Sequence, residues 1–262
     1  MVTATARPIQ PGELVMLTIR TTEAVEAVEV RAFDRQWPPF ADDARTWRVL
    51  VGVDLEVAPG SYPVSIAAGG ARSTYPLVVK SHRFPTRNLT VDPAFVTPPP
   101  DMLPRIENEA RELNRIWGES ARARLWDGPF VRPVPDPANS AFGTRSVFNG
   151  QPRSPHAGAD FLSAAGTPVK APGGGRVVLA GSLYYTGGTV IIDHGLGLFS
   201  MLAHLSAVDV KAGDTVQAGD IVGNVGATGR VTGPHLHWAV RANGARVDPL
   251  SLLFVVGEHR VH

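Results

Sequence analysis

The sequence contains no cysteine. Disulfide bonds, thiolate metal sites and cysteine nucleophiles are therefore excluded. The chain has 262 residues, of which 44% are hydrophobic and 19% charged, so it has enough apolar material for one large or two ordinary globular domains. Each of these must be held together by a hydrophobic core.

An excess of charge of either sign is also lacking. The formal net charge is +1, which gives no reason to expect a nucleic acid or an anionic membrane as a partner. Nearly all the positive charge comes from arginine, because lysine occurs only as Lys80, Lys170 and Lys211.

Long apolar runs are absent too. The longest near the C-terminus is SLLFVV, far short of the ~20 residues that a membrane-spanning helix needs. The first letters, MVTATARPIQPG, lack the apolar core of a signal peptide. We therefore expect no transmembrane segment and, if the protein is exported, a signal that is not part of this sequence.

Residues 1–80 contain short β-type runs separated by turn signals. The runs are ELVMLTIR, AVEVRAF, WRVLVGVDL and YPVSIAA. Their length and spacing predict an accessory domain that is a small β-sandwich of immunoglobulin-like architecture. We find no cluster of catalytic residue types in it, so we expect a structural or positioning module.

Residues 81–141 are expected to form a proline-rich linker with one helix at about 102–117. Gly118 is a plausible stop for that helix, and the surrounding prolines favour a fixed link because each restricts its own φ and the preceding residue. Five apolar residues recur at helical spacing and predict a stripe that docks on a domain: Leu103, Ile106, Ala110, Leu113 and Trp117.

Residues 142–262 are rich in glycine and in β-type runs. We read as successive strands the segments RVVLAG, GTVIIDHG, LFSMLAHL, GDTVQAGDIVGNVG and HLHWAVRANG. The whole chain is therefore predicted to be mainly β, and this C-terminal domain to be an antiparallel β-sheet without a long helix.

A histidine and an aspartate four residues apart occur in SPHAGADF. His156 and Asp160 share a face in a helix and in a strand, and Pro155 and Gly158 favour a loop or strand here. An imidazole and a carboxylate that converge suit a metal such as Zn²⁺. The alternative is a surface His–Asp hydrogen bond.

Two further histidines occur in TGPHLHWAV. On a strand His235 and His237 project from one face, whereas Leu236 and Trp238 project from the other. The pair is thus aimed at a common point, although two partly exposed histidines on an edge strand fit the same letters.

The remaining histidines of this region fit structural roles when taken singly. His204 ends the apolar run in SMLAHLSAV, a place where a histidine is usually structural. In IIDHG, Asp193, His194 and Gly195 predict a simple turn between strands.

Taken together, these motifs change the interpretation. The order H-x-x-x-D, then A-H-L, then H-x-H within a glycine-rich β region resembles the lysostaphin/LytM-type zinc metallopeptidases of bacterial cell walls. The resemblance runs from FGTRSVFNGQPRSPHAGADF to HLHWAVRANGARVDP and includes GTPVKAPGGGRVV, GTVIIDHGLGLFSMLAHL and the closing VDPL.

The resemblance implies a division of roles among five residues. His156, Asp160 and His237 match the family's metal ligands and would hold one Zn²⁺ per chain, with a fourth position left for water or substrate. His204 and His235 match its catalytic histidines. The implied reaction is metal-assisted hydrolysis of a peptide bond, in which a histidine handles the proton because no H-E-x-x-H glutamate is present.

The resemblance also places Tyr184 or Tyr185 near the substrate groove, where either would assist the oxyanion. Glycines in YYTGGTV and GATGRVTG can adopt positive φ and let a peptide backbone approach closely, although ordinary hairpin turns explain them as well. One position departs from the family: many relatives have tyrosine where Leu202 stands, a change expected to affect packing or substrate contact.

The implied substrate is a peptidoglycan peptide, and the implied location is periplasmic or extracellular. The D-alanyl-D-alanine carboxypeptidases share related H-x-x-x-D and H-x-H-like motifs. The sequence therefore does not decide which peptide bond is hydrolysed. A catalytically silent regulator of other wall hydrolases is the main alternative to an enzyme. A regulatory protein is a further expected partner, which would bind through the N-terminal domain. A biotin or lipoate carrier is disfavoured, because Lys170 and Lys211 flank strands and do not sit on an exposed hairpin.

Overall fold

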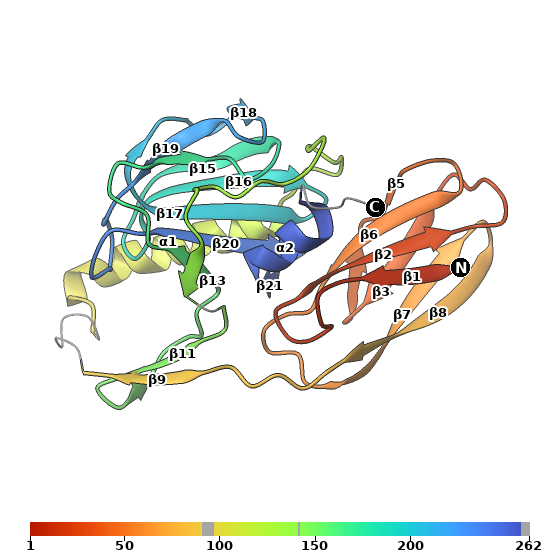
Figure 1. Ribbon diagram of the computed structural model, residues 1–262, viewed down its shortest axis with the longest axis horizontal. Coiled ribbons are helices and arrows are strands. Elements are labelled where there is room, and N and C mark those ends of the chain that lie inside the picture. Colours follow the sequence, from red (N-terminus) through yellow and green to blue (C-terminus); the bar gives the residue numbers. More distant parts are fainter. Residues whose placement is uncertain (91–96, 141, 258–262) are drawn as a thin grey trace.

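A computed structural model describes residues 1–90, 97–140 and 142–257 of the chain. The predicted linker and C-terminal domain also include residues 91–96, 141 and 258–262, which lie outside the described residues. Neither described α-helix is long and apolar enough to cross a membrane. Figure 1 shows two lobes, with the N-terminal strands in red and orange and the C-terminal sheet in green and blue.

The N-terminal lobe consists of two four-stranded sheets. One has the spatial order β1 (Val2–Thr5), β2 (Leu14–Arg20), β6 (Thr46–Gly52) and β5 (Phe40–Ala41). The other has the order β4 (Arg35–Trp37), β3 (Val28–Ala32), β7 (Gly60–Ala68) and β8 (Ala71–Val79). The four predicted runs match β2, β3, β6 and β7, and each forms a strand.

The two sheets differ in the burial of their strands, and the difference follows the pattern of apolar residues in the sequence. In β3 the valines at 28 and 30 are buried and Glu29 and Arg31 exposed, the alternation of a strand with one face in the core. In β2 the first four residues are all buried. The C-terminal lobe also packs against this strand, and Leu14 N–H donates to Ser251 Oγ of that lobe at 2.7 Å.

The connecting segment contains the predicted helix. It consists of β9 (Thr86–Leu89), a short 3₁₀ turn (Pro100–Met102) and α1 (Leu103–Gly118). The predicted apolar stripe is docked only in part. Its C-terminal end packs on Ile191 and Phe199, with the buried Ile116 at the centre, whereas Leu103 is 45% exposed and Ala110 is exposed too.

The C-terminal lobe is a ten-stranded sheet whose pairs are all antiparallel, as predicted. Its main path runs β10 (Ala138–Ser140), β13 (Gly158–Phe161), β20 (Leu236–Ala242), β17 (Leu198–Val208), β16 (Gly187–Gly195), β15 (Gly175–Leu183) and β18 (Thr215–Val216). Off this path lie β14 (Pro168–Lys170), β19 (Ile221–Val225) and β21 (Ala245–Val247). A separate small sheet has the order β12 (Gln151–Pro152), β11 (Arg145–Phe148) and β9.

The apolar run SLLFVV forms a short helix, α2 (Pro249–Val256), which the sequence analysis did not expect. Asp248 caps it by accepting from Leu250 N–H, and proline follows at the first helical position. The helix packs against β2, β13 and β20, so apolar residues occupy nearly every position and no amphipathic period marks it.

The two lobes share one hydrophobic core and a polar rim. A single cluster of buried apolar side chains includes Leu17 of β2 and Val240 of β20. At the rim Arg246 Nη2 lies 2.7 Å from Asp54 Oδ1, and Arg7 Nη2 lies 2.6 Å from Asp248 Oδ2. The N-terminal sheets are therefore fixed against the C-terminal sheet.

Candidate metal centre

Three neighbouring strands bring the site residues to one face of the C-terminal sheet. Asp160 of β13 lies opposite His237 of β20, and His237 lies opposite Ala203 of β17. On the other face Leu202 and Trp238 are opposite each other and fully buried. Leu202, the departure from the family pattern, is thus a core residue.

His156 lies just before β13 and is held by backbone hydrogen bonds. Its N–H donates to Thr144 C=O at 2.9 Å, and its own C=O accepts from Gly143 N–H at 2.7 Å. These two bonds continue the antiparallel pairing of β11 and β12 as far as His156. The loop predicted from Pro155 and Gly158 is therefore present, and it points the imidazole at Asp160.

Three side-chain atoms converge on a single point. His156 Nε2 and His237 Nδ1 lie 3.0 and 2.8 Å from Asp160 Oδ1, and they are 3.1 Å from each other. Ligands of a tetrahedral zinc ion at ~2.0–2.1 Å are about 3.3 Å apart, so the spacing and the N, N, O donor set fit such an ion. The three residues could hold a metal.

Electrostatics favour a cation at this point. Burial by itself raises the pKa of Asp160, but hydrogen bonds from His156 and His237 outweigh it and hold the pKa well below the usual range of a carboxyl group. Burial lowers the pKa of His237. An ionised carboxylate beside a neutral imidazole is the state that binds metal.

The site is partly open to solvent, and a glycine makes room for it. The ligand side chains of His156, Asp160 and His237 are between 14% and 20% exposed. A Cβ at Gly158 would lie 2.6 Å from His237 Cε1 and 2.5 Å from Trp238 O. Only glycine fits beside the His237 ring without displacing it.

His204 reaches the site through a β-bulge. Opposite β16, the residues between Leu202 and Leu205 number one more than those between their partners Val190 and Gly188. His204 has φ of 67°, in the left-handed region. In a regular strand His204 would point to the same face as the buried Leu202. The bulge instead turns it to the metal face, which is the face of the sheet that carries Asp160 and His237.

Backbone carbonyls fix the ring orientation of both remaining histidines. His204 Nδ1 lies 3.0 Å from Thr228 C=O, and His235 Nδ1 lies 3.0 Å from Gly233 C=O. Because a carbonyl only accepts, each Nδ1 donates its hydrogen, and Nε2 of the neutral ring is left as the basic atom. Burial is the largest of the causes that lower the pKa of His204, which falls to about 4.

Both histidines stand beside the three converging atoms. The His204 ring centroid is 4.8 Å from that of His235 and 5.9 Å from that of His237. His235 Nε2 lies 3.9 Å from Asp160 Oδ1. The structure therefore brings together all five residues predicted from the histidine motifs, and His235 and His237 point to one place as the strand alternation predicted.

Tyr184 and Tyr185 lie in the turn between β15 and β16. Their rings are in edge contact, with centroids 4.9 Å apart, and the Arg230 guanidinium lies 4.5 Å from the centroid of Tyr185. The next residue, Thr186, accepts a hydrogen bond from His204 N–H at 2.8 Å. The tyrosine turn is thus joined to the site through one backbone contact.

Two loops that the sequence analysis singled out by their glycines meet beside His204. Gly187 and Gly229 have φ of 61° and 78°, as expected, but the close approach is between the loops themselves. A Cβ on Gly187 would lie 2.3 Å from Thr228 Oγ1. Thr228, which the sequence analysis missed, bonds Gly188 N–H and Leu205 C=O through its hydroxyl.

His194 is structural, but the turn predicted for it is wrong. It lies inside β16, fully buried, where Nδ1 donates to Gly174 C=O at 2.8 Å and Nε2 accepts from Ser200 Oγ at 2.9 Å. Burial lowers its pKa to about 4, so the ring is neutral. The strand continues through Asp193 because β17 pairs with it on one side and β15 on the other.

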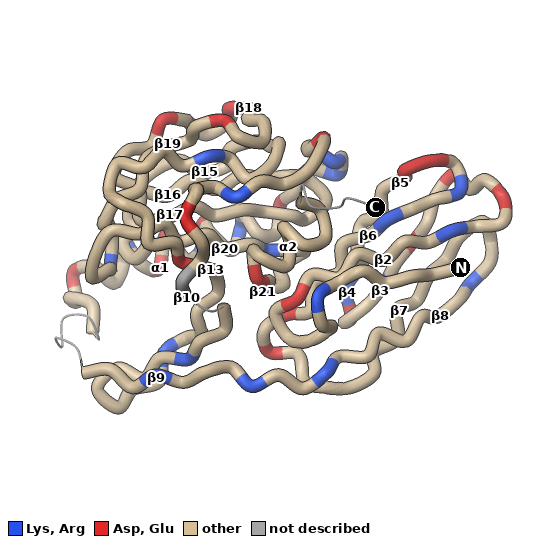
Figure 2. Tube along the Cα trace, viewed as in Figure 1, with Lys and Arg blue, Asp and Glu red and all other residues tan. Residues whose placement is uncertain are grey.

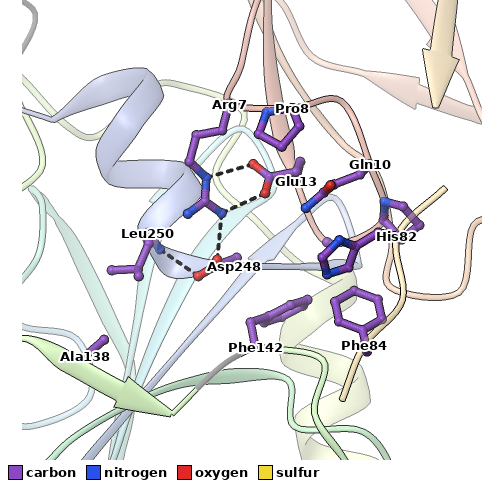
Figure 3. A pocket seen from close by; sticks show the side chains of 12 residues that line it. Arg7, Pro8, Gln10, Glu13, His82, Phe84, Ala138, Phe142, Asp248 and Leu250 are labelled. Atoms are coloured by element: carbon purple, nitrogen blue, oxygen red, sulfur yellow. Dashed lines mark hydrogen bonds and ion pairs between the residues drawn. The ribbon is translucent and has the colours of Figure 1, made fainter. Parts of the chain in front are cut away.

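A cavity of about 480 Å³ lies at the junction of the two lobes, and none of the five site residues lines it. Figure 3 shows the side chains that line it. Its charged groups are paired with one another, since Arg7 bonds to both Glu13 and Asp248. His82, Phe84 and Phe142 form its other side. With its charges already paired, this cavity offers no reactive constellation.

Comparison with known proteins agrees with this geometry. The model of Peptidase family M23 matches residues 154–249. A crystal structure from Pseudomonas aeruginosa, described as that of an M23 peptidase, aligns over 95% of this chain and 96% of its own, with 32% identity and a TM-score of 0.76.

Two curated relatives match over shorter stretches. DD-carboxypeptidase/endopeptidase Mpg of Neisseria meningitidis is 42% identical over 97 residues, which are 37% of this chain and 22% of that protein. Lysostaphin of Staphylococcus staphylolyticus is 41% identical over 108 residues, or 39% and 22% of the two chains. The chain thus spans less than a quarter of the length of these relatives.

Proposed function

Because the chain belongs to peptidase family M23, we propose that it is a zinc-dependent endopeptidase that hydrolyses peptide bonds in the stem peptides or cross-links of peptidoglycan. The observation that carries the proposal is the convergence of His156 Nε2, Asp160 Oδ1 and His237 Nδ1 at 2.8–3.1 Å. The name of the Neisseria relative, a DD-carboxypeptidase/endopeptidase, supports the substrate class.

In this proposal His156, Asp160 and His237 hold one Zn²⁺ per chain. Bound zinc supplies Lewis acidity at the scissile carbonyl and lowers the pKa of water towards ~7. The neutral His237 ring and the ionised Asp160 carboxylate described above suit this role. Three protein ligands leave room for water and substrate on the exposed side of the cluster.

His204 and His235 are the proposed proton carriers. Each ring keeps Nδ1–H on a backbone carbonyl, so Nε2 can accept the proton of the attacking water and return it to the leaving amine. A burial-lowered pKa keeps His204 in the basic form at neutral pH. Tyr184 and Tyr185 are proposed to line the groove beside them, and one of the two to assist the oxyanion.

The test is digestion of purified sacculi with zinc-loaded protein, with and without a chelator. We expect chelator-sensitive conversion of cross-linked muropeptides into monomers, detected by mass analysis. Loss of terminal D-alanine without loss of cross-links would instead assign a carboxypeptidase. Absence of any chelator-sensitive product would contradict hydrolysis and favour a catalytically silent regulator of other wall hydrolases.

The N-terminal part is proposed to be an immunoglobulin-like sandwich of residues 1–80. Its two sheets have the orders β1-β2-β6-β5 and β4-β3-β7-β8, which correspond to the immunoglobulin pattern ABED and CFG with one added strand. Residues 81–141 would be its linker and 142–262 the peptidase domain. A location in the periplasm or outside the cell follows from the proposed substrate, and a regulatory protein could bind through the sandwich.

A further inference from the structure

We propose that Glu109 of α1, paired with Arg105, is a positioning residue that fixes the Tyr184–Thr186 turn and, through it, His204. The proposal rests on the proposed function for its effect on hydrolysis. Its structural part stands on contacts between the connecting helix and the C-terminal sheet.

Two charged side chains of α1 form hydrogen bonds to backbone groups at the end of β15, on the side where no other described strand pairs with this end of it. Glu109 Oε2 accepts from Tyr184 N–H at 2.7 Å, and Arg105 Nη2 donates to Ser182 C=O at 3.1 Å. Backbone groups two residues apart point the same way on a strand, so the two side chains take the places of a neighbouring strand. The Glu109 carboxylate is well protected, with 16% of its side chain exposed.

The two charges also hold each other in place. Arg105 Nε donates to Glu109 Oε1 at 2.7 Å, one helical turn away. Each carboxylate oxygen of Glu109 therefore has its own donor, one from the helix and one from the turn. Hydrogen bonds to a charged acceptor are stronger than those between neutral groups, so this contact restrains the turn firmly.

The far end of the same turn holds the strained backbone of His204. Thr186 C=O accepts from His204 N–H at 2.8 Å, and Tyr185 C=O accepts from Arg230 N–H at 2.9 Å. A non-glycine residue with φ of 67° persists only where its surroundings fix it. Glu109 thus acts on His204 through the three residues of the turn, without touching the site.

The decisive variant is Glu109→Ala, with Glu112→Ala as its matched control. Glu112 lies on the same helix and pairs with Arg115 at 2.7 Å, but no hydrogen bond joins it to the described part of the sheet. Both variants lose one helix ion pair, so any difference between them reports the contact with Tyr184.

Two measurements are made on the full chain. Amide hydrogen exchange at Tyr184 is expected to be at least about tenfold faster in Glu109→Ala than in wild type or Glu112→Ala. With a peptidoglycan substrate, kcat is expected to fall about tenfold, while KM stays within about twofold and zinc content is unchanged. Glu109→Gln keeps an acceptor oxygen for Tyr184 N–H and is expected to restore part of kcat.

Wild-type exchange at Tyr184 in Glu109→Ala, or a faster exchange with unchanged kcat, would overturn the proposal. If Glu109→Ala does not fold, Arg105→Ala carries the same comparison, because it removes both the bond to Ser182 C=O and the pairing with Glu109. Equality of Arg105→Ala with Glu112→Ala in exchange and in kcat would then overturn the proposal. If the wild-type chain hydrolyses nothing, the proposed function fails, and the exchange rate alone then decides whether Glu109 fixes the turn.

Discussion

At the scale of single residues, the atom that each side chain turns towards the centre separates the five site residues into two groups. His156, Asp160 and His237 point one donor atom each at a common place, within 3.1 Å of one another. In His204 and His235, Nδ1 instead donates a hydrogen bond to a backbone carbonyl. We propose that a ring held in this way is oriented for proton transfer, whereas the three converging atoms could hold a metal.

This grouping predicts different losses on mutation. Asp160→Ala and His237→Ala are expected to lose stoichiometric zinc. His204→Ala is expected to keep zinc and to lose about 10²–10⁴-fold in kcat, the usual effect of removing a general acid or base. Metal content by mass spectrometry, measured beside muropeptide release, checks both, with the exposed His82→Ala as a control outside the site. Metal-free His204→Ala or fully active Asp160→Ala would contradict the grouping.

At the scale of elements, the bulge in β17 and the turn before β16 decide where His204 lies. The bulge alone would leave a strained residue free to relax. The Gly187 and Thr228 loops pack against each other beside it, and Thr228 supplies both a hydroxyl to Leu205 C=O and a carbonyl to His204 Nδ1. The site depends on this contact between loops as well as on the strands.

Gly187→Ala tests the contact between the loops. The new Cβ would lie 2.3 Å from Thr228 Oγ1 on a backbone with φ of 61°, so we expect a loss of roughly 1–3 kcal/mol in the free energy of unfolding and a lower kcat. Gly181→Ala is the matched control, because a Cβ there meets nothing within 4 Å. Urea unfolding and kcat are measured for both, and equal behaviour of the two variants would reject the argument.

At the scale of the whole molecule, the lobes behave as one folded unit because they share a core. Arg246 of β21 donates to both carboxylate oxygens of Asp54, which lies just after β6. Burial raises the pKa of Asp54, but hydrogen bonds from Arg246 outweigh this and lower it to about 2. The contact therefore stabilises the fold only while Asp54 is ionised.

The lowered pKa predicts a pH dependence of stability. An aspartate with pKa near 3.9 when unfolded and about 2 when folded contributes roughly 2 kcal/mol above pH 4, which is lost as the pH falls from about 4 to about 2. Asp54→Asn should therefore be less stable than wild type at pH 7, with the difference shrinking in acid. Urea unfolding between pH 2 and 7 measures it; a difference independent of pH would exclude this origin. Glu56→Gln, the 72% exposed partner of the same arginine, should change little.

Local patterns in the sequence predicted many of the strands and the longer helix. Alternation placed His235 and His237 on one face, the helical period found α1 to within one residue at each end, and the glycine-flanked β runs became strands. The patterns did not reveal α2, because a helix buried on most sides has no amphipathic period. They also wrongly predicted a turn at His194, because the sequence Asp-His-Gly is typical of turns. In the structure the chain stays extended there, because strands pair with β16 on both sides.

The sequence by itself determined the chemistry: two imidazoles and a carboxylate in an order and spacing that suit zinc, two more histidines, and no cysteine or H-E-x-x-H glutamate to compete with them. Only the tertiary structure decided how these groups are aimed. The turn of His204 to the metal face needs an extra residue in β17 relative to β16, and the orientation of its ring needs a carbonyl 24 positions later in the chain. Such features arise from hydrogen bonds between segments distant in sequence, and a local pattern of residues does not contain that pairing.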